Sequence, residues 1–285
     1  MRRSLLFIPA NSPAMLQNAD IFAADGVIFD LEDAVVVSEK DAALSLLNQY
    51  LSSFKLNNLE VIIRINSLNS SFSLEELDLL INDRIDTIML PKATYEDTMA
   101  FSKLIDKVSI IKKLTKNIQI IPIIESAKAV IEVNQIASVP RVSGLLLGGE
   151  DLATDLEVER SESSIELLLS RSMVVLAAKA NGIDAIDTPF TNTQDENGLL
   201  SDSNYAKRLG MNAKVSIHPN QIDIINSVFS PSQTEIDHAK KIIAVMNQKE
   251  ENQKGAFSMD GQMIDKPIIE RAQKLLAKAE KWKLL

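Results

Sequence analysis

The sequence contains no cysteine and only two histidines, His218 and His238, among its 285 residues. The absence of cysteine excludes disulfides, thiolate metal sites and a cysteine nucleophile. It is also typical of proteins that work in a reducing compartment, so we expect a cytoplasmic location. Two histidines are too few for a multi-histidine zinc site, and we expect none.

Basic residues and long hydrophobic runs are also scarce. The chain has 30 Lys and Arg against 39 Asp and Glu, a net charge of −9, which argues against a nucleic-acid partner. No stretch approaches the ~18 apolar residues of a membrane span, and the apolar run after Arg2 and Arg3 is too short for a signal peptide. We therefore predict no membrane partner. Walker-type loops, Rossmann glycine fingerprints and nucleophile elbows are absent, which argues against nucleotide hydrolysis, NAD chemistry and serine esterase chemistry.

Short apolar runs alternate with longer amphipathic segments along the chain. Eight runs are nearly continuous, as in strands buried on both faces: Leu5–Ile8, Gly26–Phe29, Val61–Ile65, Thr87–Leu90, Ile118–Ile124, Gly144–Leu147, Ile183–Ile186 and Ala213–Ile217. The segments between them include Pro13–Ala24, Ser38–Phe54, Tyr95–Leu114 and Ser163–Ala180. Eight such repeats predict an α/β fold, the (β/α)8 TIM barrel, with a doubly wound open sheet as the alternative. Pro122 falls inside the fifth run, where we expect a bulge or a later strand start.

The pattern changes after Pro219. Two further helical stretches, Ser232–Asn247 and Pro267–Trp282, are separated by a polar segment over residues 248–261. We therefore predict a barrel over residues 1–225 and a helical C-terminal extension over residues 226–285. This extension either packs against the barrel base or contacts a neighbouring subunit.

Ionisable residues follow seven consecutive predicted strands. Because active sites in parallel α/β folds lie at the carboxyl ends of the strands, these positions are the candidates for chemistry: Asp30, Glu32 and Asp33, then Arg64, Lys92, Glu125, Glu150 with Asp151, Asp187 and His218. Glu125 and Asp151 stand on adjacent strands, and two carboxylates are a typical Mg²⁺ site. The alternative is that both are solvated loop acids.

Three other positions allow two interpretations each. Arg64 is an arginine inside an apolar run, which needs a partner: a structural ion pair with Asp30 or Asp33, or a substrate carboxylate. The pair Gly148-Gly149 either lets backbone N–H groups approach an anionic ligand or simply forms a turn. Asp265 precedes Pro267 and is well placed to cap the helix that begins there.

Seven motifs in order resemble the citrate lyase beta subunit family and its relatives among the HpcH/HpaI aldolases, over essentially the whole chain. These motifs are Arg2-Arg3-Ser4-Leu5-Leu6-Phe7-Ile8-Pro9, Phe29-Asp30-Leu31-Glu32-Asp33, Arg64-Ile65-Asn66, Leu90-Pro91-Lys92, Ile124-Glu125-Ser126, Gly148-Gly149-Glu150-Asp151 and Gly261-Gln262-Met263-Ile264-Asp265. The resemblance implies a (β/α)8 barrel, assembled as a homotrimer or hexamer, that uses Mg²⁺ as cofactor.

The resemblance also implies a role for each candidate residue. Glu125 and Asp151 would be the Mg²⁺ ligands, and Arg64 would be catalytic and hold the substrate carboxylate. Glu125, Gly149 and Glu150 would contribute to substrate binding, while Asp30, Glu32 and Asp33 would surround the metal site without binding the ion directly. Asp265 would be a catalytic acid or base that reaches a neighbouring subunit's site.

The implied activity is cleavage of citryl-CoA or a citryl acyl carrier protein to oxaloacetate and an acetyl thioester. Two departures from the family pattern, Ala10 and His218 with Asn220, leave open a malyl-CoA or citramalyl-CoA lyase, a malate synthase-like enzyme, or a CoA-independent 2-oxo acid aldolase. Assembly with other citrate lyase subunits, or a non-catalytic scaffolding role, are further alternatives.

Overall fold

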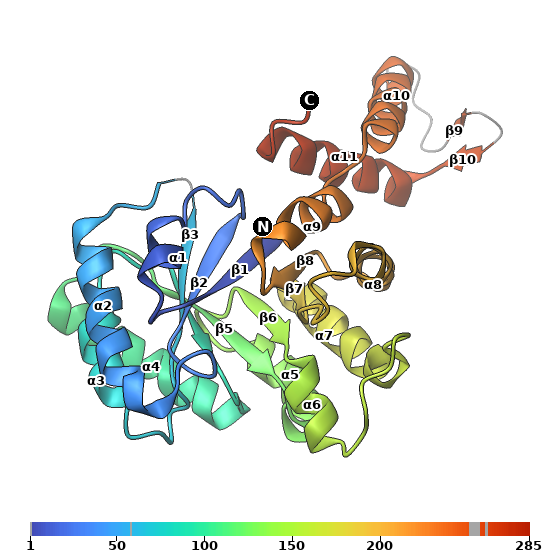
Figure 1. Ribbon diagram of the computed structural model, residues 1–285. Helices are drawn as coiled ribbons and strands as arrows, with labels where there is room; N and C mark the ends of the chain where they lie inside the picture. The colour runs from blue at the N-terminus through green and yellow to red at the C-terminus, as the bar shows by residue number, and fades with distance from the viewer. Residues whose placement is uncertain (1, 58, 251–256, 260–261) are drawn as a thin grey trace. The chain divides into compact units, whose positions relative to one another are not determined.

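The computed structural model describes residues 2–57, 59–250, 257–259 and 262–285 (Figure 1). Eight parallel strands form a closed barrel in sequence order, because β1 pairs with both β2 and β8. The strands are β1 Ser4–Pro9, β2 Gly26–Asp30, β3 Glu60–Arg64, β4 Thr87–Leu90, β5 Gln119–Ile124, β6 Gly144–Leu147, β7 Asp184–Asp187 and β8 Ala213–Ser216. The predicted (β/α)8 barrel is confirmed, and the open sheet is excluded.

Helices follow the strands and surround the barrel. They are α1 Pro13–Gln17, α2 Lys40–Ser53, α3 Ser73–Leu80, α4 Tyr95–Lys112, α5 Ala127–Ala137, α6 Gly149–Asp155, α7 Leu168–Asn181 and α8 Glu196–Leu209. Side-chain oxygens of Thr94, Ser126 and Asp195 cap α4, α5 and α8 by accepting amide hydrogens of the first turn. No helix of the described ranges is long and apolar enough to cross a membrane.

The barrel interior is filled by side chains that alternate along the strands. Leu5 and Phe7 of β1, and Ala213 and Val215 of β8, belong to this interior cluster, with Ile28, Ile62, Met89, Ile121, Ile123, Leu146 and Ile186 from the other strands. The intervening strand residues face the surrounding helices, because successive side chains of a strand point to opposite faces. Both faces are therefore buried, which explains the nearly continuous apolar runs in the sequence.

Strand β5 runs without interruption through Pro122, so it does not begin after the proline as one expectation had it. The irregularity lies in the pairing with the next segment instead. Ile120 bridges Val142, whereas Ile123 pairs with Leu146, so a step of three residues in β5 faces a step of four. A proline cannot donate to a ladder, and this shift in register occurs where the missing N–H falls.

The amino-terminal end of the barrel is closed by a buried arginine. Arg2 binds Glu60 through Nε and Nη2 at 2.6 and 2.7 Å, and binds Asp184 through Nη1 at 2.9 Å. These carboxylates begin β3 and β7, so one guanidinium links opposite sides of the barrel. The charges are paired and hydrogen-bonded, which makes this end structural rather than catalytic.

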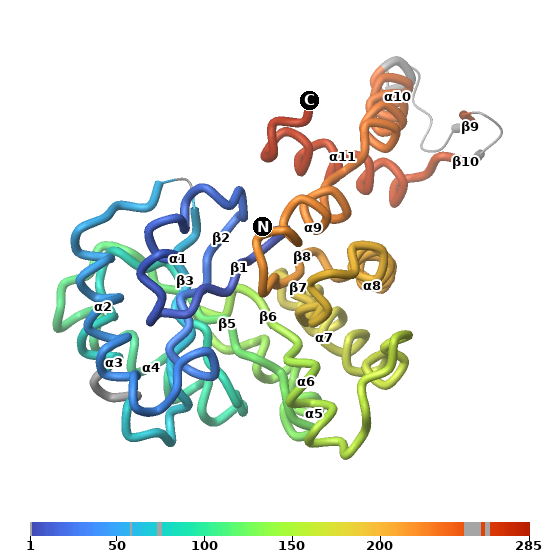
Figure 2. The backbone as a smooth tube through the Cα atoms, viewed as in Figure 1, coloured from blue at the N-terminus to red at the C-terminus, as the bar shows by residue number. Residues whose placement is uncertain are grey.

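The chain divides into two compact units, Met1–Asn226 and Ser227–Leu285, at a point inside α9 (Ile222–Phe229). The second unit contains α10 (Gln233–Glu250), a hairpin of β9 (Phe257–Met259) and β10 (Gln262–Ile264), and α11 (Lys266–Lys281). Helices α10 and α11 pack against each other around Ala239, Ile242, Ile264 and Ala272 (Figure 2). The hairpin lies in the segment read from sequence as merely polar.

Candidate active site

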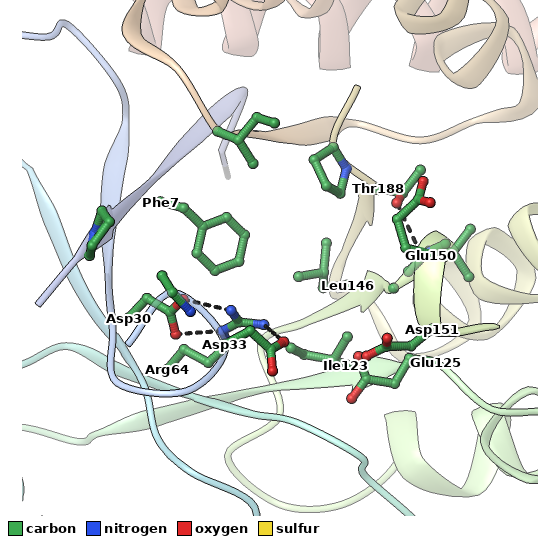
Figure 3. Close-up of a pocket in the computed structure, with 17 residues that line it drawn as sticks. Phe7, Asp30, Asp33, Arg64, Ile123, Glu125, Leu146, Glu150, Asp151 and Thr188 are labelled. Atoms are coloured by element: carbon green, nitrogen blue, oxygen red, sulfur yellow. Dashed lines mark hydrogen bonds and ion pairs between the residues drawn. The ribbon is translucent and has the colours of Figure 1, made fainter. Parts of the chain in front are cut away.

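A cavity of about 420 Å³ lies at the carboxyl ends of the barrel strands (Figure 3). Its size suits a small substrate, and active sites of this fold occur at this end. Its lining includes most of the predicted site residues: Asp30, Asp33, Arg64, Glu125, Gly149, Glu150 and Asp151. Phe7 and Thr188 also line it, and the sequence analysis had assigned neither of them to the site.

Arg64, the last residue of β3, is the centre of a charge network. Its Nε and Nη2 donate to the two carboxylate oxygens of Asp30 at 2.7 and 2.6 Å. Its Nη1 donates to Asp33 at 3.2 Å and lies 3.2 Å from a Glu32 oxygen, while the Phe7 ring centroid is 4.9 Å from the guanidinium carbon. Burial alone would lower the pKa of Arg64, but the Asp30 hydrogen bonds and the three carboxylates raise it, so the side chain stays cationic.

The loop after β2 is shaped by the carboxylate of Asp30. One Asp30 oxygen accepts the amide of Glu32 at 2.9 Å and the other accepts the amide of Ala34 at 3.1 Å. Burial raises the pKa of Glu32 to about 8; the charge of Arg64 opposes this shift and the neighbouring carboxylates add to it. Glu32 borders Arg64 but is not among the residues that line the cavity.

A buried lysine, which the sequence analysis missed, supports this loop from behind. Lys40 is only 9% exposed, and its Nζ donates to Leu31 O at 2.8 Å, Glu32 O at 2.8 Å and Asn66 Oδ1 at 2.6 Å. All three donors of the ammonium are therefore satisfied. Asn66 is itself held by Glu76, which accepts hydrogen bonds from its backbone and side-chain amides. Lysines at helix starts are common, so no sequence signal distinguished this one.

Glu125 follows β5 and is nearly buried. Its Oε1 accepts the backbone amide of Lys92, a residue after β4 with a φ of +50°. An L-residue in this region costs roughly 1–2 kcal/mol, and such strain clusters at functional sites. Burial raises the pKa of Glu125 to about 7; the Lys92 hydrogen bond opposes this shift and the charge of Asp151 adds to it. Lys92 therefore contributes its amide to the site, while its side chain is exposed.

The segment after β6 passes so close to Glu125 that it requires glycine. A Cβ added at Gly148 would lie 2.6 Å from the Cβ of Glu125 and 2.7 Å from its Oε2. Only glycine, which has no Cβ, allows this approach. Figure 3 shows Asp151, in the first turn of α6, with its carboxylate beside that of Glu125. The sequence analysis thus placed the right two carboxylates together.

The two other predicted residues of α6 have partners of their own. The Gly149 amide donates to Thr188 Oγ1 at 3.0 Å, and a Cβ at Gly149 would lie 2.8 Å from that oxygen. Glu150 is exposed at the rim, where it pairs with Arg160 at 3.0 Å. Arg160 also binds Glu166 at 2.7 Å, so the rim is cross-linked to the segment before α7.

The residues of this cavity fit a magnesium ion. Five carboxylates line it against one guanidinium, an excess of negative charge that a divalent cation offsets. The described residues contain no group of three or more histidine, aspartate or glutamate side chains arranged for a metal. Mg²⁺ does not need such a group, since one or two carboxylates suffice when water and substrate oxygens complete its shell. Glu125 and Asp151 are therefore the residues that would hold it.

Two charges at strand ends do not line the cavity, contrary to expectation. Asp187 is fully buried and binds Arg171 at 2.8 and 3.0 Å and Lys214 at 2.6 Å. Because Ile186 faces the barrel interior, Asp187 faces the surrounding helices. His218 is exposed and its Nδ1 lies 2.7 Å from Asn220 Oδ1; the preceding residue, not His218, lines the cavity.

Asp265 occupies the helix-capping position that the sequence predicted. Its Oδ1 accepts the amide of Ile268 at 3.2 Å, at the start of α11. It belongs to the second unit, whereas the cavity belongs to the first. Gly261, from the same motif, lies outside the described residues.

A closed barrel with a carboxylate-rich cavity at its carboxyl end defines a (β/α)8 protein of the class that carries catalytic sites there. The chain belongs to the HpcH/HpaI aldolase/citrate lyase family, whose model matches residues 3–219. It is 36% identical over 279 residues to the citrate lyase subunit beta of Leuconostoc mesenteroides subsp. cremoris, covering 97% of this chain and 92% of that protein.

Other relatives carry different names. The chain is 32% identical over 279 residues to the (3S)-malyl-CoA thioesterase of Cereibacter sphaeroides, covering 98% of this chain and 94% of that one. Its fold is similar to that of the CitE protein of Mycobacterium tuberculosis in complex with magnesium, acetoacetate and coenzyme A. That similarity has a TM-score of 0.79 at 26% identity and covers 98% of both chains.

Proposed function

We propose that the protein is a Mg²⁺-dependent carbon–carbon lyase that acts on a 3-hydroxyacyl thioester whose hydroxyl carbon also carries a carboxylate. The observation that carries this proposal is the arrangement of one cavity: Glu125 beside Asp151, with Arg64 across the same space. Such a pair suits a divalent cation, and the fixed guanidinium suits a carboxylate or a developing oxyanion.

The relatives supply the thioester part of the proposal. One related structure contains magnesium with coenzyme A, and another, the citrate lyase beta subunit of M. tuberculosis at 28% identity and a TM-score of 0.67, contains oxaloacetate and magnesium. The citrate lyase relatives favour a citryl group on CoA or on an acyl carrier protein. The malyl-CoA thioesterase relatives favour malyl-CoA or citramalyl-CoA instead.

The reaction breaks the C2–C3 bond of the thioester. The 3-hydroxyl gives up its proton, the C3–O bond becomes a carbonyl, and the C2–C3 electron pair becomes the enolate of the acetyl thioester. Protonation of that enolate at carbon balances the proton lost from oxygen. Arg64 contributes positive charge beside the forming carbonyl, and one such contact is typically worth about 3–4 kcal/mol. A Mg²⁺ held by Glu125 and Asp151 would polarise the same oxygen.

We further propose that Asp265 supplies the enolate proton, and that it does so in the cavity of a neighbouring copy within a homotrimer or hexamer. Assembly with other citrate lyase subunits is the alternative. Asparagine caps helices as well as aspartate does, so Asp265→Asn keeps the cap of α11 and removes only the acid. Activity restored by mixing Asp265→Asn with Glu125→Gln protein requires that the two residues come from different chains; failure to restore it contradicts this arrangement.

The test of the proposed function is product analysis of purified full-length protein against acyl-CoA and free 2-hydroxy or 2-oxo acids, with Mg²⁺ and with EDTA. We expect Mg²⁺-dependent release of a 2-oxo acid and acetyl-CoA from at least one thioester. Cleavage of CoA-free substrates alone would identify an aldolase. No activity together with no Mg²⁺ binding by calorimetry would support a scaffolding subunit and contradict the proposal.

A further inference from the structure

The charges that line the cavity restrict which acyl group it accepts. Of its ionisable lining residues only Arg64 is a cation, against five carboxylates. A pair of charges in a partly desolvated site is tolerated when each has a partner, and an unpaired charge is costly. The number of substrate carboxylates that this site can bind is therefore set by its few positive groups.

Arg64 has little capacity left for a substrate. Three of its five N–H bonds donate to Asp30 and Asp33, and the carboxylate of Glu32 lies 3.2 Å from Nη1. At most two N–H groups remain, which is what one carboxylate requires. Together with a divalent ion at Glu125 and Asp151, Arg64 can serve the carboxylate next to the reacting carbon.

The nearest other cations in the described part of the chain do not supply a second partner. Arg160 is held between Glu150 and Glu166, and it does not line the cavity. Lys92 gives its amide to Glu125 while its side chain is exposed. The remaining walls are apolar: Figure 3 shows Phe7, Ile123 and Leu146 between Arg64 and the carboxylate pair.

We propose that the 2-oxo acid handled by this site carries a single carboxylate, so that the thioester is of the malyl or citramalyl type rather than the citryl type. This inference rests on the proposed lyase function. The three substrates differ only in the third group on the hydroxyl carbon: hydrogen in malyl, methyl in citramalyl and carboxymethyl in citryl thioesters. Hydrogen or methyl suits an apolar wall, whereas a second carboxylate would lose water there without gaining a partner.

The test compares kcat/KM of the full-length protein for malyl-CoA, citramalyl-CoA and citryl-CoA at saturating Mg²⁺. We expect one of the first two to exceed citryl-CoA by at least about tenfold, which corresponds to about 1.4 kcal/mol. Calorimetric titration of Mg²⁺-loaded protein with glyoxylate, pyruvate and oxaloacetate provides a readout other than turnover. There we expect oxaloacetate to bind most weakly.

A charge placed on the apolar rim sharpens the test. Ile217 lines the cavity and is 38% exposed, so a lysine there can keep its ammonium hydrated. Ile217→Lys is expected to shift the kcat/KM ratio towards citryl-CoA by about tenfold. Ile217→Gln is the uncharged control, and it should leave the ratio within about twofold of the original.

The two proposals fail in different ways. A preference for citryl-CoA, or equal use of all three thioesters, overturns the inference and leaves the lyase function intact. An Ile217→Gln shift as large as that of Ile217→Lys also overturns it, because charge would then not be the cause. Cleavage of none of the thioesters overturns the proposed function itself.

Discussion

The barrel contains two buried charge clusters that use the same residue types but differ in charge balance. The mouth cluster comprises Asp30, Glu32, Asp33, Arg64, Glu125 and Asp151, five carboxylates with one cation. The wall cluster comprises Arg171, Asp187, Asp202 and Lys214, two carboxylates with two cations. The wall cluster is almost completely buried between β7, β8, α7 and α8, whereas the mouth cluster opens into a cavity.

The two clusters shift the pKa of their carboxyls in opposite directions. In the wall cluster burial would raise the pKa of Asp202, but Lys214 and Arg171 lower it below its ordinary value. In the mouth cluster burial prevails, and the pKa is raised to about 7 at Glu125 and about 8 at Glu32. A balanced cluster stabilises the fold, whereas an unbalanced one at a cavity is poised for a cation that the chain does not provide.

The largest expected effect is the loss of activity on Glu125→Gln. This change keeps the size of the side chain but removes one of two ligands, so Mg²⁺-dependent thioester cleavage should fall by about 10³-fold or more. Steady-state kinetics with Mg²⁺ varied separately measure it. Glu96→Gln, at an exposed position in the first turn of α4, is the matched control and should retain full activity.

Breaking the wall cluster should affect stability rather than chemistry. Arg171→Met leaves Asp187 and Asp202 with fewer partners, and disrupting a buried ion pair typically costs about 3–5 kcal/mol. Urea unfolding measures this loss. Adding Asp202→Asn to the same chain should recover part of it, because the uncompensated charge is removed. A large fall in Mg²⁺ affinity in the folded single variant would show that the two clusters are not independent.

Lys40→Met should affect both stability and activity, because Lys40 supports the mouth cluster from behind. Its loss leaves two loop carbonyls and Asn66 Oδ1 without a donor, which costs about 2–3 kcal/mol. Activity should fall about 10–100-fold in kcat, because Arg64 loses its fixed partners. Lys116→Met is the control: its ion pair with Asp86 is 2.6 Å long but 42% exposed, and should contribute under about 1 kcal/mol. Equal effects of both changes would contradict a positioning role.

The smallest expected effect is a pH dependence of stability without metal. Because the pKa of Glu125 and Glu32 is raised on folding, the unfolded chain loses these protons first, and the free energy of unfolding falls as pH rises from about 4.5 to about 8. Mg²⁺ should oppose the fall, so its stabilisation should grow with pH. Thermal unfolding with EDTA or Mg²⁺ between pH 5.5 and 8.5 measures both trends. An unchanged slope in Glu32→Gln/Glu125→Gln protein would contradict this assignment.

Much of the fold was predictable because buried parallel strands leave a strong pattern. All eight predicted runs overlap the observed strands, and β4 and β6 match to the residue. The predicted helix over Pro13–Ala24 was too long, since α1 ends at Gln17. The β9–β10 hairpin was missed because its strands are only three residues long.

The site was predictable only as far as strand ends determine position. Strand ends identified the residues that line the cavity, but not the direction in which each side chain points. Asp187 follows the same pattern as Glu125 yet faces the opposite way, since one residue of register reverses the face. Lys40 and the Lys92 amide could not be found either, because their roles arise from contacts between segments distant in sequence.

The most direct test of the central claim is calorimetric titration of Mg²⁺ into the metal-free protein and its Asp151→Asn variant at pH 8. The account predicts one site per chain in the original protein, and affinity weakened by at least about tenfold in the variant. Arg171→Met protein, measured where it is folded, should bind like the original. Equal affinity with and without Asp151 would contradict the claim that the unbalanced carboxylates of the mouth cluster are the metal site.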